Sequence, residues 1–145
     1  MPLQIINSFA TWILKKRIHQ MELFLKYPHE VQEELLFNLI KASENTQLGK
    51  KYDFSSMKSY TSFSERIPVS TYEELEPLIE KTRQGEQNVF WHSNIKWFAK
   101  SSGTTNAKSK FIPVSSEALE NCHYKASKDL LCLYLNNNEE SQMFT

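Results

Sequence analysis

The sequence predicts a mixed α/β fold that is rich in helix. Three stretches of the chain, residues 3–26, 28–45 and 115–138, carry apolar side chains at helical spacing. Residues 94–100 alternate between apolar and polar side chains, and residues 111–114 form a short apolar segment, so both are predicted to be strands of one β-ribbon. A chain of 145 residues is long enough to form one globular domain with a hydrophobic core.

Two helices are expected before residue 50, and a proline separates them. Tyr27 ends the first helix, because the residue before a proline avoids helical geometry. Pro28 suits the first turn of the second helix, where its missing N–H has no partner to lose. The second helix is expected to fade near Asn45, and Gly49 indicates a loop.

The middle of the chain, residues 50–69, shows no clear period, and one short helix is expected near residues 62–66. A capping box then begins the next helix. Two overlapping pairs fit this motif, Ser70 with Glu73 and Thr71 with Glu74. The helix is expected to stop at Gly85, and Pro77 is expected to kink it or divide it into two pieces.

A serine is expected to begin the last predicted helix. Either Ser115 or Ser116 is suited to cap it, with Glu117 near its positive end. Its buried stripe is expected to contain side chains at helical spacing, Leu119, Cys122, Ala126, Leu130 and Leu133. Asparagines at residues 136–138 are expected to end it. The two cysteines of the chain lie too far apart along this helix to form a disulfide, and both are expected to be buried, reduced thiols.

Hydroxyl side chains gather around one glycine between the two predicted strands. The segment reads Ser101, Ser102, Gly103, Thr104 and Thr105, and the lysines beside it are Lys100, Lys108 and Lys110. Hydroxyls, exposed backbone N–H groups and ammonium groups are the donors that a phosphate needs, and glycine lets the backbone approach it closely. We interpret this segment as a loop that binds the phosphates of a nucleotide. The alternative is an ordinary surface turn, since the same residue types form turns and the spacing fits neither a P-loop nor a dinucleotide fingerprint.

The order of these residues resembles the phosphate loop of adenylate-forming enzymes. Ser-Ser-Gly-Thr-Thr is followed five residues later by Lys110, then by two apolar residues and Pro113. Within that superfamily the chain is most similar to the auxin-responsive acyl-acid amido synthetases, the Gretchen Hagen 3 family, in the version found in bacteria. Further segments fit the family's pattern, Thr46–Tyr52, Arg66–Glu74 and Gly85–Glu86. Asn106 and Ala107 stand where the plant enzymes have two glycines, and Ser109 stands in place of a proline.

The resemblance runs from about Tyr27 to Ser115 and implies the N-terminal part of the large subdomain of an adenylate-forming enzyme. An isolated two-stranded ribbon is marginal in water, so we expect the ribbon to join a sheet whose other strands lie outside this chain. We therefore expect an N-terminal fragment of a single adenylation domain, with the rest of that domain and the C-terminal domain absent. Its expected parts are a helical segment 1–48, an irregular segment with a helix 49–93, a strand–loop–strand 94–114 and a helix 115–138.

The resemblance also implies an ATP-dependent ligase, which activates a carboxylic acid as an acyl-adenylate and transfers the acyl group to an amino acid to form an amide. In such an enzyme the phosphates would be held by Ser101, Ser102, Gly103, Thr104, Thr105 and Lys110. Lys108 is the second candidate for the ammonium, and Lys100 is expected to face solvent. Mg²⁺ is implied by the ATP chemistry, but this stretch offers no clear carboxylate for it and no catalytic residue can be assigned. This chain alone is expected to be inactive.

Two other functions stay open at this point. The first is an acyl-coenzyme A ligase, in which a thiol replaces the amine as the acceptor. The second belongs to another class, a non-catalytic helical interaction module that has kept an adenylation sequence. The retained hydroxyls and Lys110 speak against this second function, because a scaffold has no need of them.

Composition narrows the choice of partners. The net charge is zero, so the sequence carries no electrostatic footprint for nucleic acid. The apolar part of the N-terminal stretch precedes its basic cluster, which is not the order of a signal peptide, and it is too short for a membrane span. An interfacial membrane helix remains an alternative to a core-facing one. The cytoplasm is the expected location.

Histidine and aromatic residues offer less specific signals. The four histidines are scattered without the spacing of metal ligands, and we expect structural or surface roles for them. Trp91, Trp97 and Phe98 lie around the first strand. We expect them to belong to the core rather than to a platform on which a base stacks.

Overall fold

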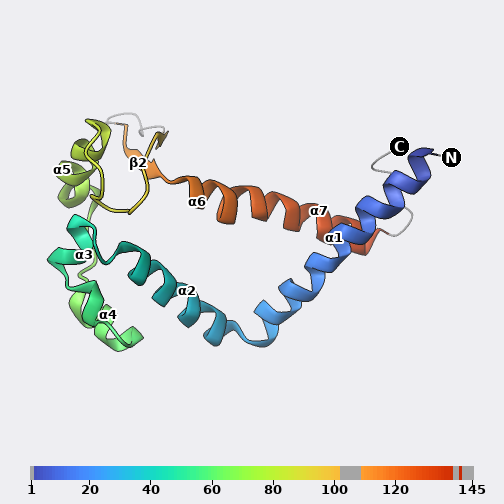
Figure 1. Ribbon diagram of the computed structural model, residues 1–145, viewed down its shortest axis with the longest axis horizontal. Coiled ribbons are helices and arrows are strands. Elements are labelled where there is room, and N and C mark those ends of the chain that lie inside the picture. The colour runs from blue at the N-terminus through green and yellow to red at the C-terminus, as the bar shows by residue number, and fades with distance from the viewer. Residues whose placement is uncertain (1, 102–108, 139–140, 142–145) are drawn as a thin grey trace. The chain divides into compact units, whose positions relative to one another are not determined.

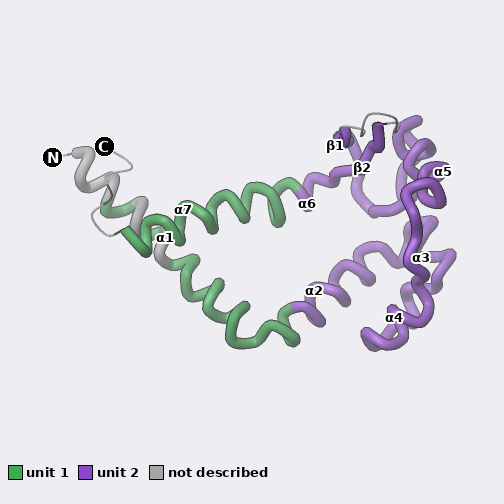
Figure 2. Tube along the Cα trace, turned by 180° about the vertical axis from the view of Figure 1, so that it is seen from behind, with its two compact units in different colours: residues 1–31, 119–145 green, residues 32–118 purple. Residues whose placement is uncertain are grey.

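The computed structural model of this protein describes residues 2–101, 109–138 and 141. These residues fall into two compact units, which Figure 2 colours separately. Unit 1 comprises residues 1–31 with 119–145, and unit 2 comprises residues 32–118. Both units contain buried side chains of their own, so each is described by itself.

Unit 1 is built on two helices that contact each other. The helices α1 (Pro2–Lys26) and α7 (Lys125–Asn137) run in opposite directions (Figure 1). Arg17 joins them through two parallel hydrogen bonds, because its Nε donates to Asp129 Oδ1 at 2.7 Å and its Nη2 donates to Asp129 Oδ2 at 3.0 Å. Two side chains of α7 are buried, Cys132 and Leu135. The predicted ends of both helices, at Tyr27 and at the run of asparagines, are confirmed.

The turn that precedes α7 is a π-helix, η2 (Leu119–Tyr124), which follows the short α6 (Ser116–Ala118) of unit 2. The predicted buried stripe is wrong here. Its exposed members are Cys122, Ala126, Leu130 and Leu133. The prediction extended one 3.6-residue period through this region, whereas a π-helix has a wider turn and interrupts that period. Both cysteines are free, as expected, but Cys122 is exposed rather than buried.

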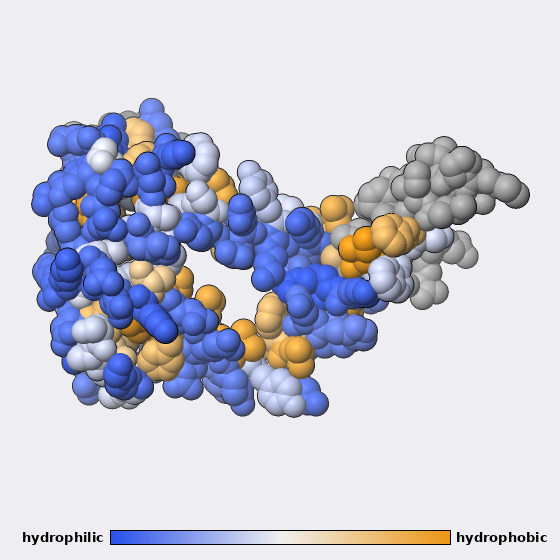
Figure 3. All heavy atoms as spheres, viewed as in Figure 1, coloured by the Kyte–Doolittle hydropathy of each residue, from blue (hydrophilic) through white to orange (hydrophobic). Residues whose placement is uncertain are grey.

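Both helices of unit 1 expose apolar side chains, and hydrophobic atoms are visible on their surface in Figure 3. Exposed examples include Phe9, Trp12, Leu23 and Leu25 on α1, and Leu130, Leu133 and Tyr134 on α7. The expectation that the N-terminal helix faces a core is therefore wrong for these side chains. In the described part of the chain no helix combines the length and apolarity that a membrane crossing requires.

Unit 2 begins at residue 32, within α2 (Pro28–Ser43). Three short helices follow: α3 (Gln47–Lys51), the 3₁₀-helix η1 (Phe54–Ser56) and α4 (Tyr60–Arg66). Pro28 begins α2, and the short helix expected near residues 62–66 is present as α4, so both predictions are confirmed. A hydrophobic core forms where these helices meet. Its buried residues are Ile40, Phe54 and Met57, with Leu36, Leu48, Phe63 and Ile67 packed against them.

The next helix, α5 (Tyr72–Arg83), begins with a complete capping box. The second of the two predicted pairs forms it, because Thr71 Oγ1 accepts from the backbone N–H of Glu74 and the Glu74 carboxylate accepts from the backbone N–H of Thr71. Pro77 lies inside α5 without dividing it, so the predicted alternative in which Pro77 divides the helix into two pieces is wrong. Pro77 has no backbone N–H, so the helix continues with one donor fewer at this position.

The two strands form an antiparallel ribbon within unit 2. Strand β1 (Trp97–Lys100) pairs with β2 (Phe111–Val114) so that Trp97 lies opposite Val114 and Lys100 lies opposite Phe111. The predicted strand at residues 94–100 is thus shorter than expected. Trp97 is 50% exposed, which contradicts its assignment to the core, whereas Phe98 is half-buried. The fold is therefore helix-rich with a small two-stranded sheet, as predicted.

Candidate functional site

The base of the predicted phosphate loop is closed by hydrogen bonds between its two ends. The backbone N–H of Ser101 donates to the carbonyl of Lys110 at 3.0 Å. In return the backbone N–H of Lys110 donates to Ser101 Oγ at 3.2 Å. The first bond extends the register of β1 and β2 by one residue pair, and the second ends on a side chain. Ser101 and Lys110 are therefore neighbours at the mouth of the segment that separates them.

The ammonium group of Lys110 contacts the first turn of α5. Its Nζ lies 3.2 Å from Glu73 Oε1 and 4.9 Å from the centre of the Tyr72 ring. A hydrogen bond from the backbone N–H of Glu73 itself, followed by one from Lys110, lowers the pKa of the Glu73 carboxyl. The sequence prediction offered Glu73 as a possible capping-box residue with Ser70, and it missed this ion pair. The pair joins residues 37 positions apart, so no local pattern could have revealed it.

Tyr72 also attaches β2 to α5. Its hydroxyl accepts a hydrogen bond from the backbone N–H of Phe111 at 3.0 Å. At the other end of α5, the guanidinium of Arg83 lies over the Phe111 ring, 4.0 Å from its centre. Figure 1 shows α5 beside the ribbon. The helix α5 thus contacts β2, which begins directly after Lys110, through one hydrogen bond to the backbone and one ring contact.

A carboxylate supports the other end of the ribbon. Glu117 Oε2 accepts hydrogen bonds from Trp91 Nε1 at 3.1 Å and from Ser93 Oγ at 2.9 Å, and Glu117 Oε1 lies 3.8 Å from His92 Nε2. Burial would raise the pKa of Glu117, but hydrogen bonds from its own backbone N–H, Ser93 and Trp91 outweigh it, so the pKa lies below its usual value. These bonds tie the segment before β1 to the turn after β2.

Ser115, the residue that follows β2, caps the turn in which Glu117 lies. Its Oγ accepts from the backbone N–H of Ala118 at 3.0 Å. Of the two serines that the sequence offered as caps, Ser115 is therefore the one that the structure uses.

Five predicted loop residues lie outside the described part of the chain. They are Ser102, Gly103, Thr104, Thr105 and Lys108. The same holds for Asn106 and Ala107, which depart from the family pattern. Of the predicted site residues, the structure describes Ser101 and Lys110 and brings them together. Lys100 is exposed, as predicted.

The segment Thr46–Tyr52 has a structural role. Thr46 Oγ1 donates to the carbonyl of Ser43 at 2.7 Å and accepts from the backbone N–H of Gly49 at 3.0 Å, which caps α3. Gly49 was predicted to lie in a loop, but it is a buried residue of α3. A Cβ atom at Gly49 would lie 2.0 Å from the Ser43 carbonyl oxygen, so only glycine fits.

The start of α3 also docks on the chain that follows α5. The backbone N–H groups of Gln47 and Leu48 donate to the carbonyls of Asn88 and Val89 at 2.7 and 3.1 Å. The Gln47 side chain donates to the carboxylate of Glu86. Two segments of the family pattern, residues 46–52 and residues 85–86, therefore contact each other and brace unit 2.

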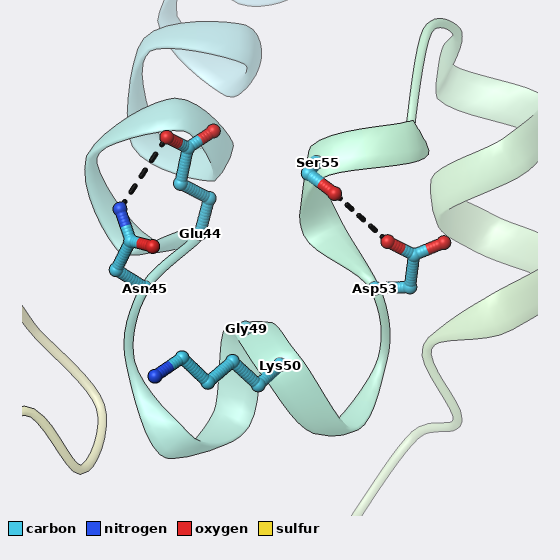
Figure 4. A pocket seen from close by; sticks show the side chains of 6 residues that line it. All are labelled: Glu44, Asn45, Gly49, Lys50, Asp53 and Ser55. Carbon is cyan, nitrogen blue, oxygen red and sulfur yellow. Dashed lines mark hydrogen bonds between the residues drawn. The ribbon is translucent and has the colours of Figure 1, made fainter.

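A hollow of about 310 Å³ lies beside α3 (Figure 4). Glu44 and Asn45 lie on one side of it and Asp53 and Ser55 on the other, with Lys50 between them. Hydrogen bonds from Ser56 and Ser55 lower the pKa of Asp53. Among the residues that the structure describes, no group of three or more His, Cys, Asp or Glu side chains could hold a metal ion. The sequence had not singled out this hollow.

Comparison with solved structures identifies the class of fold. The chain matches the structure of AtGH3.15 acyl acid amido synthetase in complex with 2,4-DB with a TM-score of 0.65 and 23% sequence identity, over 74% of this chain and 19% of that chain. It therefore shares the fold of part of a GH3 adenylate-forming enzyme. The sequence matches the GH3 family N-terminal domain over residues 17–144, and the protein belongs to this family.

Similar relatives are plant enzymes. The chain is 30% identical to indole-3-acetic acid-amido synthetase GH3.2 of Arabidopsis thaliana over 106 residues. These residues make up 72% of this chain and 19% of the relative. It is 29% identical over 104 residues to jasmonoyl-L-amino acid synthetase JAR4 of Nicotiana attenuata, covering 71% of this chain and 18% of the relative. The chain thus spans about a fifth of the length of these relatives.

Proposed function

We propose that this protein serves an ATP-dependent ligase reaction, in which a carboxylic acid is activated as an acyl-adenylate and its acyl group is then joined to an amino acid. Membership of the GH3 family and the amido synthetase names of its relatives support this function. In this proposal the chain contributes the phosphate-binding segment between β1 and β2. The cytoplasm is the proposed location.

The observation that carries the proposal is the closed base of the loop. Ser101 and Lys110 hold its two ends together, and an ammonium and a hydroxyl lie at its mouth. The hydrogen bond from the backbone N–H of Phe111 to the Tyr72 hydroxyl attaches β2 to α5, next to the residue that carries this ammonium group. A site that stabilises charge needs donors that are held in place before the charge develops.

The chemistry explains why such donors are useful. A free carboxylate is a poor electrophile, and attack of its oxygen on the α-phosphorus of ATP turns it into an acyl-adenylate and releases pyrophosphate. Negative charge builds on the departing pyrophosphate, so hydrogen-bond donors aimed at it stabilise the transition state more than the ground state. We propose this role for Ser101 and Lys110, together with Ser102, Gly103, Thr104 and Thr105.

Mg²⁺ usually accompanies ATP in such reactions, held by one or two carboxylates and by the phosphates themselves. Within the described ranges no group of three or more His, Cys, Asp or Glu side chains could hold a metal ion. The carboxylate of Glu73, which lies at the loop mouth, is paired with Lys110. We therefore assign no step to a metal here.

Calorimetric titration with ATP tests the proposed site. Replacing Lys110 by alanine removes a charge-assisted contact, and we expect the affinity for ATP to fall by about 10- to 100-fold, which corresponds to about 1.5–3 kcal/mol. Lys96→Ala removes the same charge from an exposed position outside the loop and is the control, for which we expect little change. Equal binding by both variants would contradict the assignment of Lys110.

Activity distinguishes the proposed ligase from its alternatives. ATP–pyrophosphate exchange by the full-length protein, driven by a panel of carboxylic acids, reports adenylate formation. Supplying coenzyme A in place of amino acids then separates a thioester-forming ligase from an amide-forming one. A folded protein that neither exchanges pyrophosphate nor binds ATP would instead support a non-catalytic interaction module.

A further inference from the structure

We propose that Glu73 is an exchangeable counter-ion of Lys110, which occupies the ammonium group while no phosphate is bound and gives it up when an anion binds. This inference rests on the proposed function, because it assumes that Lys110 receives a phosphate. It goes further by placing a competing carboxylate on a separate element, the first turn of α5. Glu73 would then set both the affinity of the site for anions and the position of Lys110 before they arrive.

The geometry places the two groups in direct contact. Glu73 Oε1 lies 3.2 Å from Lys110 Nζ, and the Tyr72 ring centre lies 4.9 Å from the same nitrogen. The hydrogen bond from Phe111 N–H to the Tyr72 hydroxyl holds this part of β2 against the helix that carries Glu73. The contact therefore follows from the attachment of β2 to α5.

Of the acidic residues on α5, Glu73 is the one that forms an ion pair with Lys110. The other acidic residues on α5 are Glu74, which completes the capping box, Glu76, and Glu80, which pairs with Arg83 at 2.7 Å. Arg83 lies over the Phe111 ring and does not take up Glu73. Within the described part of the chain, an anion that approaches Lys110 therefore competes with the carboxylate of Glu73.

The exposure of the pair makes exchange feasible. The Lys110 side chain is 44% exposed and that of Glu73 is 68% exposed. Ion pairs at such exposure are weak and screened by solvent, so a polyphosphate with several negative charges competes well with a single carboxylate. A buried pair would instead resist exchange, because separating it leaves a charge without compensation.

Glu73 also keeps a partner after Lys110 has left. Its carboxylate accepts a hydrogen bond from its own backbone N–H in the first turn of α5, and this bond is the largest influence that lowers its pKa. The positive end of a helix favours a negative charge at this position. Glu73 thus stays ionised near neutral pH in both states, and the exchange needs no proton.

Binding measurements test the competition. We expect Glu73→Gln to bind both ATP and inorganic pyrophosphate about two- to fivefold more tightly than the wild-type protein, because a neutral amide competes less with the anion. Glu76→Gln is the matched control, since it changes the net charge by the same amount from an exposed position on α5. The gain should vanish when Glu73→Gln is combined with Lys110→Ala.

A second readout follows the carboxylate itself. Titration of the Glu73 side chain by NMR should give a pKa that rises on addition of pyrophosphate and rises likewise in Lys110→Ala, because both remove the ammonium. A purely structural ion pair would respond to the substitution but not to the anion. A Glu73 pKa that pyrophosphate leaves unchanged, although the protein binds it, overturns the exchange.

The two readouts separate the failure of this inference from that of the proposed function. If no variant binds ATP or pyrophosphate, the proposed function fails and the exchange fails with it. If Lys110→Ala loses binding while Glu73→Gln and Glu76→Gln bind equally, the phosphate site stands and the exchange alone is overturned. Tighter binding in Glu73→Gln than in Glu76→Gln, with a Glu73 pKa that responds to pyrophosphate, supports it.

Discussion

Thr46 has no exposed surface, and its hydroxyl both donates and accepts a hydrogen bond within the turn that starts α3. Gly49 completes this turn because its backbone N–H reaches Thr46 without a side chain in the way. The sequence offered a glycine and a preceding threonine, but it predicted a loop. Tertiary contact decides the outcome, since the first N–H groups of α3 bond to the carbonyls of Asn88 and Val89.

The tight fit at Gly49 gives a prediction at the residue scale. In an ordinary helix, glycine to alanine stabilises by up to about 1 kcal/mol. We expect Gly49→Ala to have the opposite sign here and to lower the free energy of unfolding by about 1–3 kcal/mol, because its Cβ would overlap the Ser43 carbonyl oxygen.

Urea denaturation measures this effect, with Lys50→Ala as the control at the next, exposed position of the same helix. A more stable Gly49→Ala protein would show that the turn relaxes and that the close approach is unimportant.

At the element scale, α1 and α7 are joined by the pair between Arg17 and Asp129. Both side chains are largely buried, at 15% and 23% exposed. The hydrogen bond from Arg17 is the main cause that lowers the pKa of Asp129. A carboxyl whose pKa is lower in the folded state contributes stability above its unfolded pKa of about 3.9 and loses it as the pH falls through the folded value.

Asp129→Asn should therefore lower the free energy of unfolding by about 1–3 kcal/mol at pH 7. The difference from wild type should stay constant down to about pH 5 and shrink below about pH 4, where the wild-type carboxylate is protonated. Urea denaturation followed by circular dichroism over this pH range checks both statements.

Glu22→Gln, which alters an exposed carboxylate of α1, serves as the control and should stay within about 0.5 kcal/mol of wild type. A difference for Asp129→Asn that does not depend on pH would mean that packing, and not charge, holds the two helices together.

Element boundaries were the most predictable part of the fold. The Tyr27–Pro28 break, the capping box, the second strand and the asparagines at the end of α7 are local signals, and each marks a boundary that the structure has. The π-helix at Leu119–Tyr124 carries no such signal, so the prediction of the buried face of the last helix was wrong. The pairing of Glu73 with Lys110 was also beyond a local pattern, because it depends on how α5 meets β2.

At the scale of the whole molecule, the described chain forms two units with different degrees of burial. Unit 1 buries Cys132 and Leu135, whereas unit 2 has a core around Ile40, Phe54 and Met57. The candidate site at the ribbon lies within unit 2. The sequence predicted its hydroxyls and lysines from their chemistry and from the family resemblance, but the supporting contacts of Tyr72 and Glu117 come from the fold.

The two cysteines of unit 1 make its opening measurable. Cys132 is 1% exposed, and burial raises the pKa of its thiol, whereas Cys122 is exposed. We expect iodoacetamide to modify Cys122 at least about tenfold faster than Cys132 in the folded protein, because Cys132 reacts only when the unit opens. Mass spectrometry of timed samples gives both rates, and the same experiment in denaturant should make them similar. Equal rates in the folded protein would contradict the packing of α7 against α1.

The contact between Trp91 and Glu117 allows the ribbon to be followed by tryptophan fluorescence. An indole whose N–H ends on a carboxylate emits from a polar, ordered environment, while Trp12 and Trp97 are each about half exposed to water. Replacing those two by phenylalanine leaves a single emitter at the start of the ribbon. Its spectrum then records, without any attached dye, whether the segments on either side of the strands stay fastened together.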